Sequence, residues 1–512
     1  MSQSYYLTTA ISYVNARPHF GHAYEFIASD AIVRYQRMKG KRVYFLSGVD
    51  EHSAQVEKAA REAGLPPQEY CDKMAVIFKD LHEKVGSSLS DFIRTSEPRH
   101  HDTTRELLRR SYEKGDIYKG SYTGYYCYSC EAYYQEKDLE SWNCPVHKRP
   151  VDWIEEENYF FKLTSYTDRL KEYFQQNPEF VYPEHYKNEM LSLIDRGLQD
   201  ISISRSTTTW GVPLPWDEKH VAYVWYDALS NYLTGVGFLK DDDLFNTFWP
   251  ADAHVIGKDI NRFHSVFWPA MLMSCDIPIP RQVLVHGFIY HRGEKMSKTL
   301  GNIVDPFALV DSYGRDPIRY FLLREIGFGY DGNYSEEALI KRYNADLAND
   351  LGNLFSRVLS MLKKYREGVV PRVAGSEDQL RLKIPETVDI YIQNMDRYAL
   401  HLAISAVWEL ISHANRYVDE QAPWALAKDP DKAEQLDRVL LNLIETLRTV
   451  AIMVHPIMPE KSQIMLERLN CAVEGGPDAA PQLENLIKGA DMYAGTHIQP
   501  GEALFPRLEV KK

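Results

Sequence analysis

Residues 5–50 read YYLTTAISYVNARPHFGHAYEFIASDAIVRYQRMKGKRVYFLSGVD. The opening run, residues 5–13, is rich in Tyr, Leu, Thr and Ile, as a buried β-strand is, and it ends in a turn around Gly21. Apolar residues then recur every three or four positions over residues 22–38, which predicts a helix, and residues 42–47 predict a second strand. A strand, a turn, a helix and a strand in this order form a βαβ unit. We therefore expect an α/β fold with a doubly wound parallel sheet of the Rossmann type, which binds nucleotides.

The length and composition of the chain narrow its class. The chain has 512 residues, of which 44% are hydrophobic and 26% charged, so we expect an ordinary globular protein of several domains. The net charge of −13 argues against a strongly basic coat for nucleic acid, although a local basic face is compatible with it. The longest uncharged apolar stretch, residues 266–273, is too short for a membrane helix, and the opening MSQSYYLTTA does not read as an export signal. We expect a cytoplasmic protein without membrane contact.

The pattern changes along the chain in a way that divides it into segments. A Tyr-rich and Cys-rich stretch interrupts the α/β pattern from about residue 119. Short apolar runs typical of strands resume in VAYVWYDAL (221–229), HVIGKDI (254–260) and RQVLVHGFIY (281–290), and helical periodicities take over past about residue 338. The expected segments are the first half of the sheet domain at 1–118, an insertion at 119–221, the second half of the sheet domain at 222–290, a linking region at 291–337 and an α-helical bundle at 338–512.

Three of the six cysteines lie close together in the insertion. Two residues separate Cys127 from Cys130, as in a CxxC motif. After thirteen more residues the same spacing recurs between Cys144 and His147. Two such pairs joined by a loop suit a tetrahedral zinc ion with three sulfur ligands and one imidazole, which leaves no coordination position open. We expect one structural Zn2+ per chain, and the alternative is a chance grouping of cysteines. So few cysteines also indicate a reducing compartment.

The turn after the first strand contains the first candidate catalytic motif, Pro18-His19-Phe20-Gly21-His22. In an open α/β sheet, ligands bind at the carboxyl ends of the strands, and a helix N-terminus attracts phosphate through its free N–H groups and its dipole. The two histidines could therefore donate hydrogen bonds to phosphate oxygens. The alternative is that they are polar loop residues near the helix N-cap.

A second candidate motif, GEKMSKTLGN, covers residues 293–302. It is a basic loop bounded by glycines. Lys295 and Lys298 in such a loop could close over a triphosphate and neutralise the charge that develops during phosphoryl or nucleotidyl transfer. The alternative is a solvated surface loop.

Together the two motifs resemble those of the class I aminoacyl-tRNA synthetases, in which an HxGH element precedes a KMSK element. In this chain about 275 residues separate them. Five segments are similar, in the same order, to those of the methionyl-tRNA synthetase family, in the type with one zinc knuckle and no C-terminal RNA-binding extension. They are TTAISYVNARPHFGHAYE, WYDALSNY, IGKDINRFHSVFWPAMLM, HGFIYHRGEKMSKTLGN and DLGNLFSRV. The resemblance covers nearly the whole chain.

The resemblance implies a two-step reaction, in which the methionine carboxylate attacks the α-phosphorus of ATP, pyrophosphate leaves, and the acyl group moves to the 3′ end of tRNA(Met). It implies that His19 and His22 bind phosphate oxygens, and that Lys295 and Lys298 stabilise the transition state, with Mg2+ carried in on ATP. The chain departs from the family at Thr299, where the family usually has Ser. A hydroxyl survives that change, so we expect a modest effect.

The resemblance also implies two binding sites on the sheet. Asp50 would pair with the α-ammonium of methionine, and aromatic walls suit a thioether. Without the motif, Trp225 and Tyr232 would more often be ordinary core residues. Ser53 replaces a family glycine beside Asp50. The methionine site would comprise Ala10, Ile11, Tyr13, Asp50, Trp225, Ala228, Tyr232 and His286. The ATP site would comprise His19, Gly21, His22, Gly257, Lys258, Asp259 and Lys298.

In the helical bundle the resemblance implies an anticodon-binding site. Asn353 and Arg357 are four residues apart and share one helix face, and Trp424 follows Pro423 at a helix start. Amide, guanidinium and indole groups are the ones that stack on and hydrogen-bond to single-stranded bases, so these three would read the CAU anticodon. From the residues alone, a capping or surface pair and a packed aromatic are favoured, and only the ordered resemblance favours recognition. The zinc knuckle would lie near the acceptor end of the tRNA, and we expect a monomer.

Three other interpretations remain open at this point. A different class I synthetase would share both motifs, a catalytically silent tRNA-binding homologue would keep the bundle, and a small-molecule nucleotidyltransferase would share the HxGH loop. Tyr13, Trp225, Tyr232 and His286 together favour methionine over the first. Retention of both histidines and both lysines argues against the second, and the insertion and the bundle are unexplained by the third.

Overall fold

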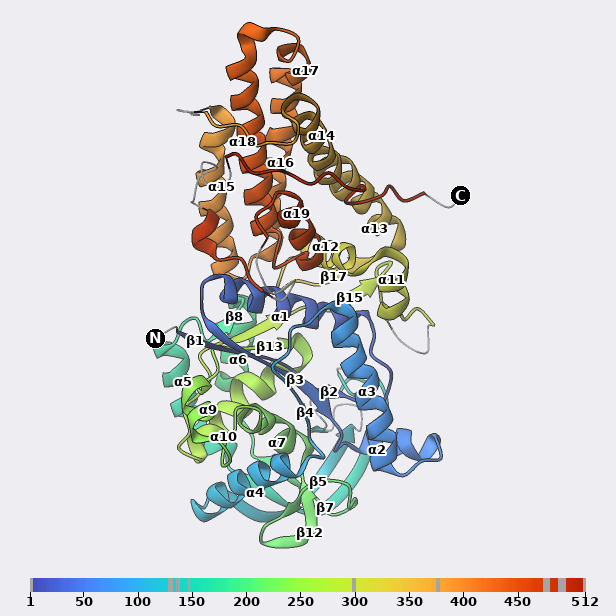
Figure 1. The fold of residues 1–512 in the computed structure, drawn as a ribbon. Coiled ribbons are helices and arrows are strands. Elements are labelled where there is room, and N and C mark those ends of the chain that lie inside the picture. The colour runs from blue at the N-terminus through green and yellow to red at the C-terminus, as the bar shows by residue number, and fades with distance from the viewer. Residues whose placement is uncertain are drawn as a thin grey trace.

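The computed structural model describes residues 3–127, 132–134, 136, 139–145, 148–296, 301–373, 378–472, 479–486 and 494–509. The molecule is elongated, with a helical bundle at one end, an α/β body in the middle and a small antiparallel sheet at the other end (Figure 1). The fold expected from the sequence, a doubly wound parallel sheet followed by a helical bundle, is confirmed.

A seven-stranded sheet forms the centre of the α/β body. Its main path runs β2-β3-β1-β13-β14-β8, with β4 also paired to β3, and every pairing is parallel. The first strand therefore lies in the middle, and the chain winds outward from it in two directions, so the switch point falls between β1 and β13. The strands are β1 (Ser4–Thr9), β2 (Ser12–Tyr13), β3 (Arg42–Asp50), β4 (Asp91–Arg94), β8 (Val181–Tyr182), β13 (Ala253–Gly257) and β14 (Val283–His286).

Helices cover both faces of this sheet. Alternate residues of a strand point to opposite faces, and in β1 the side chains of Tyr5 and Leu7 join one buried cluster while Tyr6 joins another. The first face packs against α1 (Phe20–Met38), α3 (Pro67–Val85) and α12 (Arg315–Glu325). The second packs against α4 (Pro98–Glu113), α7 (Val224–Leu229), α8 (Asn231–Thr234) and α10 (Trp268–Ser274).

The N-terminal βαβ unit is confirmed, and one of the expected strands is wrong. The run at 5–13 splits into β1 and β2, the helix is α1, and β3 extends three residues beyond the expected end. VAYVWYDAL, expected to be a strand, instead comprises the end of β12 (Asp217–Ala222) and helix α7. A short, fully buried apolar run has no polar face, so its periodicity cannot distinguish a strand from a helix.

The segment after α4 contains mainly antiparallel strands. β5 (Ile117–Cys127) and β7 (Asp152–Phe161) form a long ribbon, which β6 (Ala132–Tyr134) and β9 (Ile201–Ser202) extend. β10 (Ser204–Arg205), β11 (Pro213–Leu214) and β12 form a second small sheet. Helices α5 (Thr167–Gln176) and α6 (Glu184–Asp195) flank β8, which joins the edge of the parallel sheet. This ribbon lies at the end of the molecule opposite the bundle (Figure 1).

The C-terminal part is helical where the periodicities predict it. The expected runs correspond to α14 (Asn353–Arg366), α16 (Leu400–Gln421) and α18 (Ala433–Met453), and α15 (Gln379–Asp396), α17 (Pro423–Leu426) and α19 (Pro459–Arg468) complete the bundle. A third small sheet of β15 (Ile289–His291), β16 (Glu294–Lys295) and β17 (Gly332–Tyr334), with α11 (Pro306–Tyr313) and α13 (Glu336–Arg342), connects it to the body. No helix in the described part of the chain is long and apolar enough to cross a membrane.

Candidate active site

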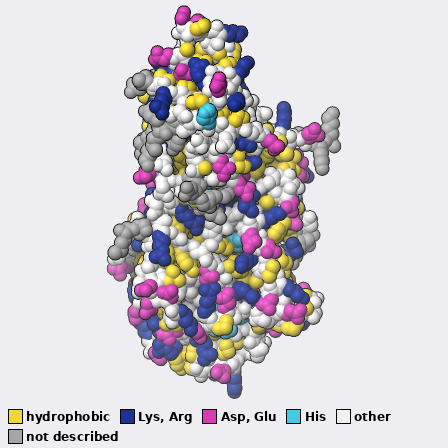
Figure 2. Space-filling view, viewed as in Figure 1, with side chains coloured by type: hydrophobic (Ala, Val, Ile, Leu, Met, Phe, Trp, Pro, Cys, Tyr) yellow, Lys and Arg dark blue, Asp and Glu magenta, His cyan; other side chains and the backbone are white. Residues whose placement is uncertain are grey.

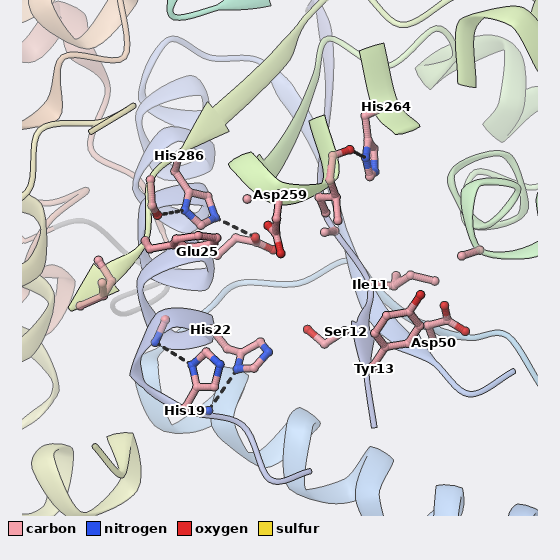
Figure 3. A pocket seen from close by; sticks show the side chains of 18 of the residues that line it. Ile11, Ser12, Tyr13, His19, His22, Glu25, Asp50, Asp259, His264 and His286 are labelled. Atoms are coloured by element: carbon pink, nitrogen blue, oxygen red, sulfur yellow. Dashed lines mark hydrogen bonds and ion pairs between the residues drawn. The ribbon is translucent and has the colours of Figure 1, made fainter. Parts of the chain in front are cut away.

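A cavity of about 320 Å³ opens at the carboxyl ends of the parallel strands, at the switch point of the sheet. Its walls come from the residues that follow β1, from the ends of β3, β13 and β14, and from the first turns of α1 and α7. The two histidines of α1 lie on one side, and Tyr13 and Asp50 lie on the other, with Glu25, Asp259 and His286 along the rim between them (Figure 3). The cavity therefore brings charged, imidazole and aromatic groups from distant segments together.

Two histidines cap the N-terminus of α1 and thereby fix their own protonation sites. The His19 Nδ1 accepts a hydrogen bond from the Gly21 N–H at 3.1 Å, and the His22 Nδ1 accepts one from the His19 N–H at 3.0 Å. A backbone N–H can only donate, so Nδ1 is the bare nitrogen in both rings and Nε2 carries the proton. The ring centroids are 4.0 Å apart. The helix N-terminus thus presents two imidazole N–H donors side by side.

Both imidazoles are neutral near pH 7. Burial lowers the pKa of His19 to about 4. Burial, together with the neighbouring His19 ring, lowers the pKa of His22 well below its ordinary value. The positive end of the α1 dipole disfavours the charged forms as well. Neutral donors can bind a phosphate without forming a tight ion pair in the ground state, and they are already aligned when charge develops in a transition state.

A buried carboxylate, Glu25, and a third imidazole, His286, form a hydrogen-bonded pair at the rim of the cavity. The Glu25 Oε2 lies 2.9 Å from the His286 Nε2, and the His286 Nδ1–H donates to the carbonyl of Gly287 at 2.8 Å (Figure 3). Burial raises the pKa of Glu25. Burial alone would lower the pKa of His286, but Glu25 and the carbonyl outweigh it and raise that pKa. One proton is therefore shared between the two side chains, and the pair holds the end of β14 against α1.

The far end of the cavity carries a carboxylate beside aromatic rings. Asp50, the last residue of β3, is buried, and its Oδ1 accepts from the backbone N–H of His52 at 3.1 Å. Trp225 stacks on Phe263 with centroids 4.0 Å apart, and its edge meets Tyr13 at 6.3 Å. The end therefore combines one negative charge with polarizable walls.

A second aromatic wall is held by hydrogen bonds. The His264 Nδ1–H donates to the carbonyl of Ile260 at 3.1 Å, which leaves Nε2 to accept from the Tyr232 hydroxyl at 2.7 Å. His264 lies in a π-helical turn, Phe263–Phe267, a distortion that is frequent at functional sites. The tyrosine ring is thereby fixed in one orientation against the cavity.

At the end of β13 the carboxylate of Asp259 lies close to the Cα atom of Gly257. A Cβ atom added at Gly257 would lie 2.9 Å from the Asp259 Oδ1, so the carboxylate occupies the space that any larger residue would need. Both residues line the cavity. Asp259 is thus placed as an acceptor at the strand end.

The two described lysines of the candidate site differ in position. Lys295 lines the cavity, and its Nζ lies 4.5 Å from the centroid of the Phe288 ring. Lys258 does not line the cavity, because its Nζ pairs with both oxygens of Asp331, at 2.7 and 2.8 Å. Lys298 and Thr299 lie outside the described residues.

The cavity gathers most of the residues that the sequence singled out. Those lining it are Ala10, Ile11, Tyr13, His19, Gly21, His22, Asp50, Trp225, Ala228, Tyr232, Gly257, Asp259, His286 and Lys295. Sequence reasoning missed several further lining residues: Ser12, Glu25, Leu229, Ile260, Gly287, Phe288, Ile289 and Met296. Glu25 could have been found, because it follows His22 by three residues on the same helix and so shares its face.

Two of the four expected zinc ligands lie in the described part of the insertion. Cys127, at the end of β5, and Cys144 are both buried and belong to one small cluster with Tyr134. Cys130 and His147 lie outside the described residues. Two buried thiols brought together from segments seventeen residues apart fit the donor set that zinc prefers.

The three expected anticodon residues lie on the bundle. Asn353 begins α14 and is exposed, and Arg357, one turn later, donates to the Asp419 Oδ1 at 2.8 Å. Asp419 lies near the end of α16, five residues before Trp424, which begins the next helix and is 44% exposed. Trp424 is therefore not packed in the core. The ion pair between Arg357 and Asp419 links α14 to the end of α16.

Comparison with known protein families agrees with this arrangement. The model described as tRNA synthetases class I (M) matches residues 5–152 and 135–359. The model described as the anticodon binding domain of methionyl tRNA ligase matches residues 370–510. The two models together cover most of the chain.

Individual relatives match over nearly the whole length. The chain is 44% identical to the methionine–tRNA ligase of Caldanaerobacter subterraneus subsp. tengcongensis, over 100% of this chain and 80% of that one. It is 46% identical to the methionine–tRNA ligase of Brucella melitensis, over 99% and 98% of the two chains. The Mycobacterium tuberculosis methionyl-tRNA synthetase in complex with methionyl-adenylate superimposes with a TM-score of 0.93 at 43% identity, over 99% and 100% of the two chains. The chain belongs to the methionyl-tRNA synthetase family, within the class I tRNA synthetases.

Proposed function

We propose that this chain joins L-methionine to tRNA(Met) in two steps within the cavity at the switch point. In the first, a methionine carboxylate oxygen bonds to the α-phosphorus of ATP, and the bond from that phosphorus to the bridging oxygen breaks, so that pyrophosphate leaves. In the second, a ribose hydroxyl at the 3′ end of tRNA attacks the acyl carbon, loses its proton, and AMP leaves. The observation that carries the proposal is that one cavity joins two imidazole N–H donors to a carboxylate beside aromatic walls.

His19 and His22 would act on the phosphates. Their Nε2–H groups donate to oxygens of the α-phosphoryl group, where negative charge is redistributed as the fifth bond forms. Because both rings are neutral, their contribution grows with the charge that develops and is not spent on binding ATP in the ground state. Lys295 approaches from the third small sheet and would neutralise the departing pyrophosphate together with Lys298. ATP enters with Mg2+, which shields the phosphates.

Asp50 and the aromatic walls would orient methionine. The carboxylate at the end of β3 pairs with the α-ammonium, and its geometry is held by the backbone N–H of His52. Trp225, Tyr13 and Tyr232 provide faces and edges against which a thioether packs favourably. Asp259 accepts from a ribose hydroxyl of ATP, and His286, held by Glu25, closes the rim. These groups would place the attacking carboxylate within reach of the α-phosphorus.

Zinc would be structural. Cys127 and Cys144, with Cys130 and His147, would hold one Zn2+ ion in a closed tetrahedral site, and this ion would fix the fold of the loop after β5. Buried sulfur atoms at two of these positions support the ligand set. The metal takes no part in the reaction at the cavity, which is built on the parallel sheet.

The bundle would read the anticodon of tRNA(Met) through Asn353, Arg357 and Trp424, because exposed amide, guanidinium and indole groups can stack on unpaired bases and bind their edges. The division of labour follows the proposed segments, with activation at 1–118 and 222–290, the acceptor end at 119–221, the linking region at 291–337 and the anticodon at 338–512. A role in translation would place the protein in the cytoplasm.

Amino-acid-dependent exchange between ATP and labelled pyrophosphate tests the activation step. The purified protein would be supplied with each of the twenty amino acids singly, without tRNA. We expect exchange with methionine alone. Exchange with another amino acid would retain the class I chemistry and overturn the methionine pocket, and no exchange with or without tRNA would overturn the proposal.

A further inference from the structure

A second cavity, of about 480 Å³, lies directly beside the first. It is enclosed by helix α2 (Ala54–Glu62), the β5–β7 ribbon and the end of β12, elements that gather at the end of the molecule away from the bundle (Figure 1). Two short segments of the chain contribute residues to both cavities. In one segment Asp50 lines the first cavity and His52 the second, and in the other Trp225 lines the first and Tyr223 the second.

The wall shared by the two cavities contains a buried imidazole with a fixed tautomer. The His52 Nδ1 lies 2.7 Å from the Asp227 Oδ2, and the other oxygen of Asp227 lies 2.8 Å from the His100 Nε2 and accepts from the Thr104 hydroxyl at 3.0 Å. Burial alone would raise the pKa of Asp227, but His100 and His52 outweigh it and hold that pKa well below its ordinary value. The carboxylate is therefore ionised and accepts a hydrogen bond from the Nδ1–H of His52.

This tautomer leaves the His52 Nε2 as a hydrogen-bond acceptor in the neutral ring. His52 is one of the residues that line the second cavity, and among the residues that the structure describes its Nε2 has no hydrogen-bond partner. The ring is held edge-on to Trp210, with centroids 5.3 Å apart. A buried acceptor that is aimed by a carboxylate and lines a cavity is suited to a ligand hydroxyl.

The lining of this cavity also carries a cation between aromatic rings. The Arg205 guanidinium lies 4.5 Å from the centroid of Tyr223 and 5.4 Å from that of Tyr126, and its Nη1 donates to the carbonyl of Ser204 at 2.7 Å. Lys58 and Arg61 add exposed positive charge on the α2 side. Because Arg205 and both rings are buried against one another, this group contributes positive charge to the cavity, and basic side chains attract phosphate.

Two carboxylates, Glu57 and Glu156, also line the cavity. They would repel a ligand that consisted of an anion alone. Glu57 accepts from the Thr208 hydroxyl through Oε2 at 2.9 Å, and Glu156 lies on the ribbon side. A carboxylate is the acceptor that matches the exocyclic amino group of cytosine. The combination of cation, rings, carboxylate and imidazole acceptor therefore fits a whole cytidine nucleotide better than a free phosphate.

We propose that this second cavity binds the penultimate nucleotide of the tRNA 3′ end, a cytidine, and that the His52 Nε2 accepts a hydrogen bond from its 2′-hydroxyl. The inference rests on the proposed function, because that function places the terminal ribose at the acyl carbon beside Asp50. The nucleotide before the terminal one must then lie just beyond the wall formed by Asp50 to Ser53, which is where this cavity begins. His52 is a positioning residue in this proposal, since it orients the acceptor end without touching the reacting atoms.

The first test uses the unaltered enzyme and altered RNA. Methionyl-adenylate is formed on the enzyme, and transfer is followed in single-turnover experiments with tRNA(Met) that carries 2′-deoxycytidine at the penultimate position. The matched control carries 2′-deoxycytidine one position earlier. Loss of one hydrogen bond from a neutral acceptor predicts transfer roughly five- to tenfold slower with the penultimate substitution and little change with the control. Equal rates for both RNAs would overturn the site.

The second test assigns the contact to His52. In His52→Asn the amide nitrogen replaces the Nδ1–H donor to Asp227, but no atom reaches the Nε2 position, whereas in His52→Gln the amide reaches it. We expect the ratio of ribo to deoxy transfer rates to fall to about one in His52→Asn and to be retained in His52→Gln. An unchanged ratio in His52→Asn would exclude His52 as the partner. Failure of methionine-dependent exchange in the wild-type enzyme would instead overturn the proposed function, which separates the two claims.

Discussion

At the residue scale, the site depends on where protons lie on imidazole rings. Backbone N–H groups occupy Nδ1 of His19 and His22, so each ring offers Nε2–H. A carboxylate occupies the Nδ1 side of His52, so the neutral form of that ring offers an acceptor. Histidine side chains therefore act as donors toward the first cavity, and a histidine side chain acts as an acceptor toward the second. The neighbouring groups, and not the residue type, decide which.

Two substitutions at His22 separate its structural and chemical roles. In His22→Gln the amide reaches the Nε2 position and keeps a donor, whereas in His22→Asn the amide oxygen keeps the acceptor for the His19 N–H. We expect methionine-dependent exchange to fall by about 100-fold or more in His22→Asn and by clearly less in His22→Gln. Thermal unfolding should show the opposite order, with His22→Gln less stable by about 1 kcal/mol through loss of the cap. Equal exchange rates in the two variants would refute a donor role for Nε2.

Gly257→Ala tests the placement of the carboxylate at the end of β13. The new Cβ would lie 2.9 Å from the Asp259 Oδ1 and would push the carboxylate aside. We expect the KM for ATP in the exchange reaction to rise by about tenfold, with the KM for methionine little changed. The two constants are measured in the same titration series. A selective rise in the methionine KM would contradict the assignment of Asp259 to ATP.

At the scale of elements, the body and the bundle meet through buried charge on α12. The Arg319 guanidinium pairs with Asp30 of α1 at 2.7 Å and donates to the carbonyls of Pro456 and Ile457, at 2.8 and 2.9 Å, just before α19. It is fully buried. Because an unpaired buried charge is costly, this contact requires α1, α12 and the start of α19 to keep one arrangement.

Asp316 lies in the first turn of α12. Its titration is expected to make the free energy of unfolding depend on pH. Its Oδ2 accepts from the Lys461 N–H at 2.6 Å, and burial raises its pKa to about 6. The folded state therefore binds this proton more tightly than the unfolded state, so stability is fully present below about pH 4 and falls as the pH rises through 6. The loss above pH 6 is about 2 to 3 kcal/mol.

Asp316→Asn removes that titration. We expect the variant to melt a few degrees higher than the wild type at pH 8 and at about the same temperature at pH 4.5, as measured by differential scanning fluorimetry. Asp311→Asn, on the exposed face of the preceding helix α11, provides the matched control. A stabilisation of equal size at both pH values would show that Asp316 is not the titrating group.

At the scale of the whole molecule, the parallel sheet, whose strand ends line the active cavity, lies between the bundle and the antiparallel ribbon (Figure 1). On the face shown in Figure 2, Lys and Arg side chains are interspersed with Asp and Glu over both body and bundle. This mixture agrees with the net charge of −13, and on this face tRNA would meet local groups of basic side chains rather than one basic surface. A tRNA charged here would contact both ends of the molecule.

Trp424→Ala tests recognition at the bundle end. Stacking of a base on an aromatic ring contributes about 1 to 3 kcal/mol, so we expect kcat/KM for tRNA(Met) to fall about 10- to 100-fold. Exchange without tRNA does not involve the bundle and should be retained. Leu402→Ala, another exposed apolar residue of the bundle, is the control. Normal charging by Trp424→Ala would remove this residue from the anticodon site.

Cys127→Ser tests the metal at the ribbon end. We expect the wild type to contain one zinc per chain by plasma emission spectroscopy and the variant to contain none, with a lower melting temperature. Cys471→Ser, far from the insertion in the sequence, should keep its metal. A variant with unchanged zinc content would disprove the ligand set.

Much of this fold could be predicted because local patterns decide it. The alternation before Gly21 and the periodicity after His22 follow from burial on a sheet and on one helix face, and α14, α16 and α18 follow the same rule. The strand expected at VAYVWYDAL is wrong, because burial on all sides erases the periodicity that separates a strand from a helix. The contact between His52 and Asp227 could not be predicted either, since 175 residues separate them and only the fold joins them.

The residues of the candidate site could be predicted where they lie in sequence motifs. Contacts between residues that are distant in the sequence could not be predicted. His19 and His22 stand in a segment that carries the resemblance, and the role of Asp50 was implied by it. The ion pair of Lys258 with Asp331, in contrast, depends on a loop from the third small sheet. The protonation sites of the histidines also required the structure, because a sequence does not show which backbone groups the rings meet.

The most direct measurement is to isolate the product of the first step on the enzyme. The protein is incubated with methionine and ATP labelled at the α-phosphate, in the absence of tRNA, and is then separated from small molecules by gel filtration. We predict about one equivalent of methionyl-adenylate per active chain, and we predict that added tRNA(Met) converts it to methionyl-tRNA and AMP. Absence of bound methionyl-adenylate, in protein that binds both substrates, would contradict the account.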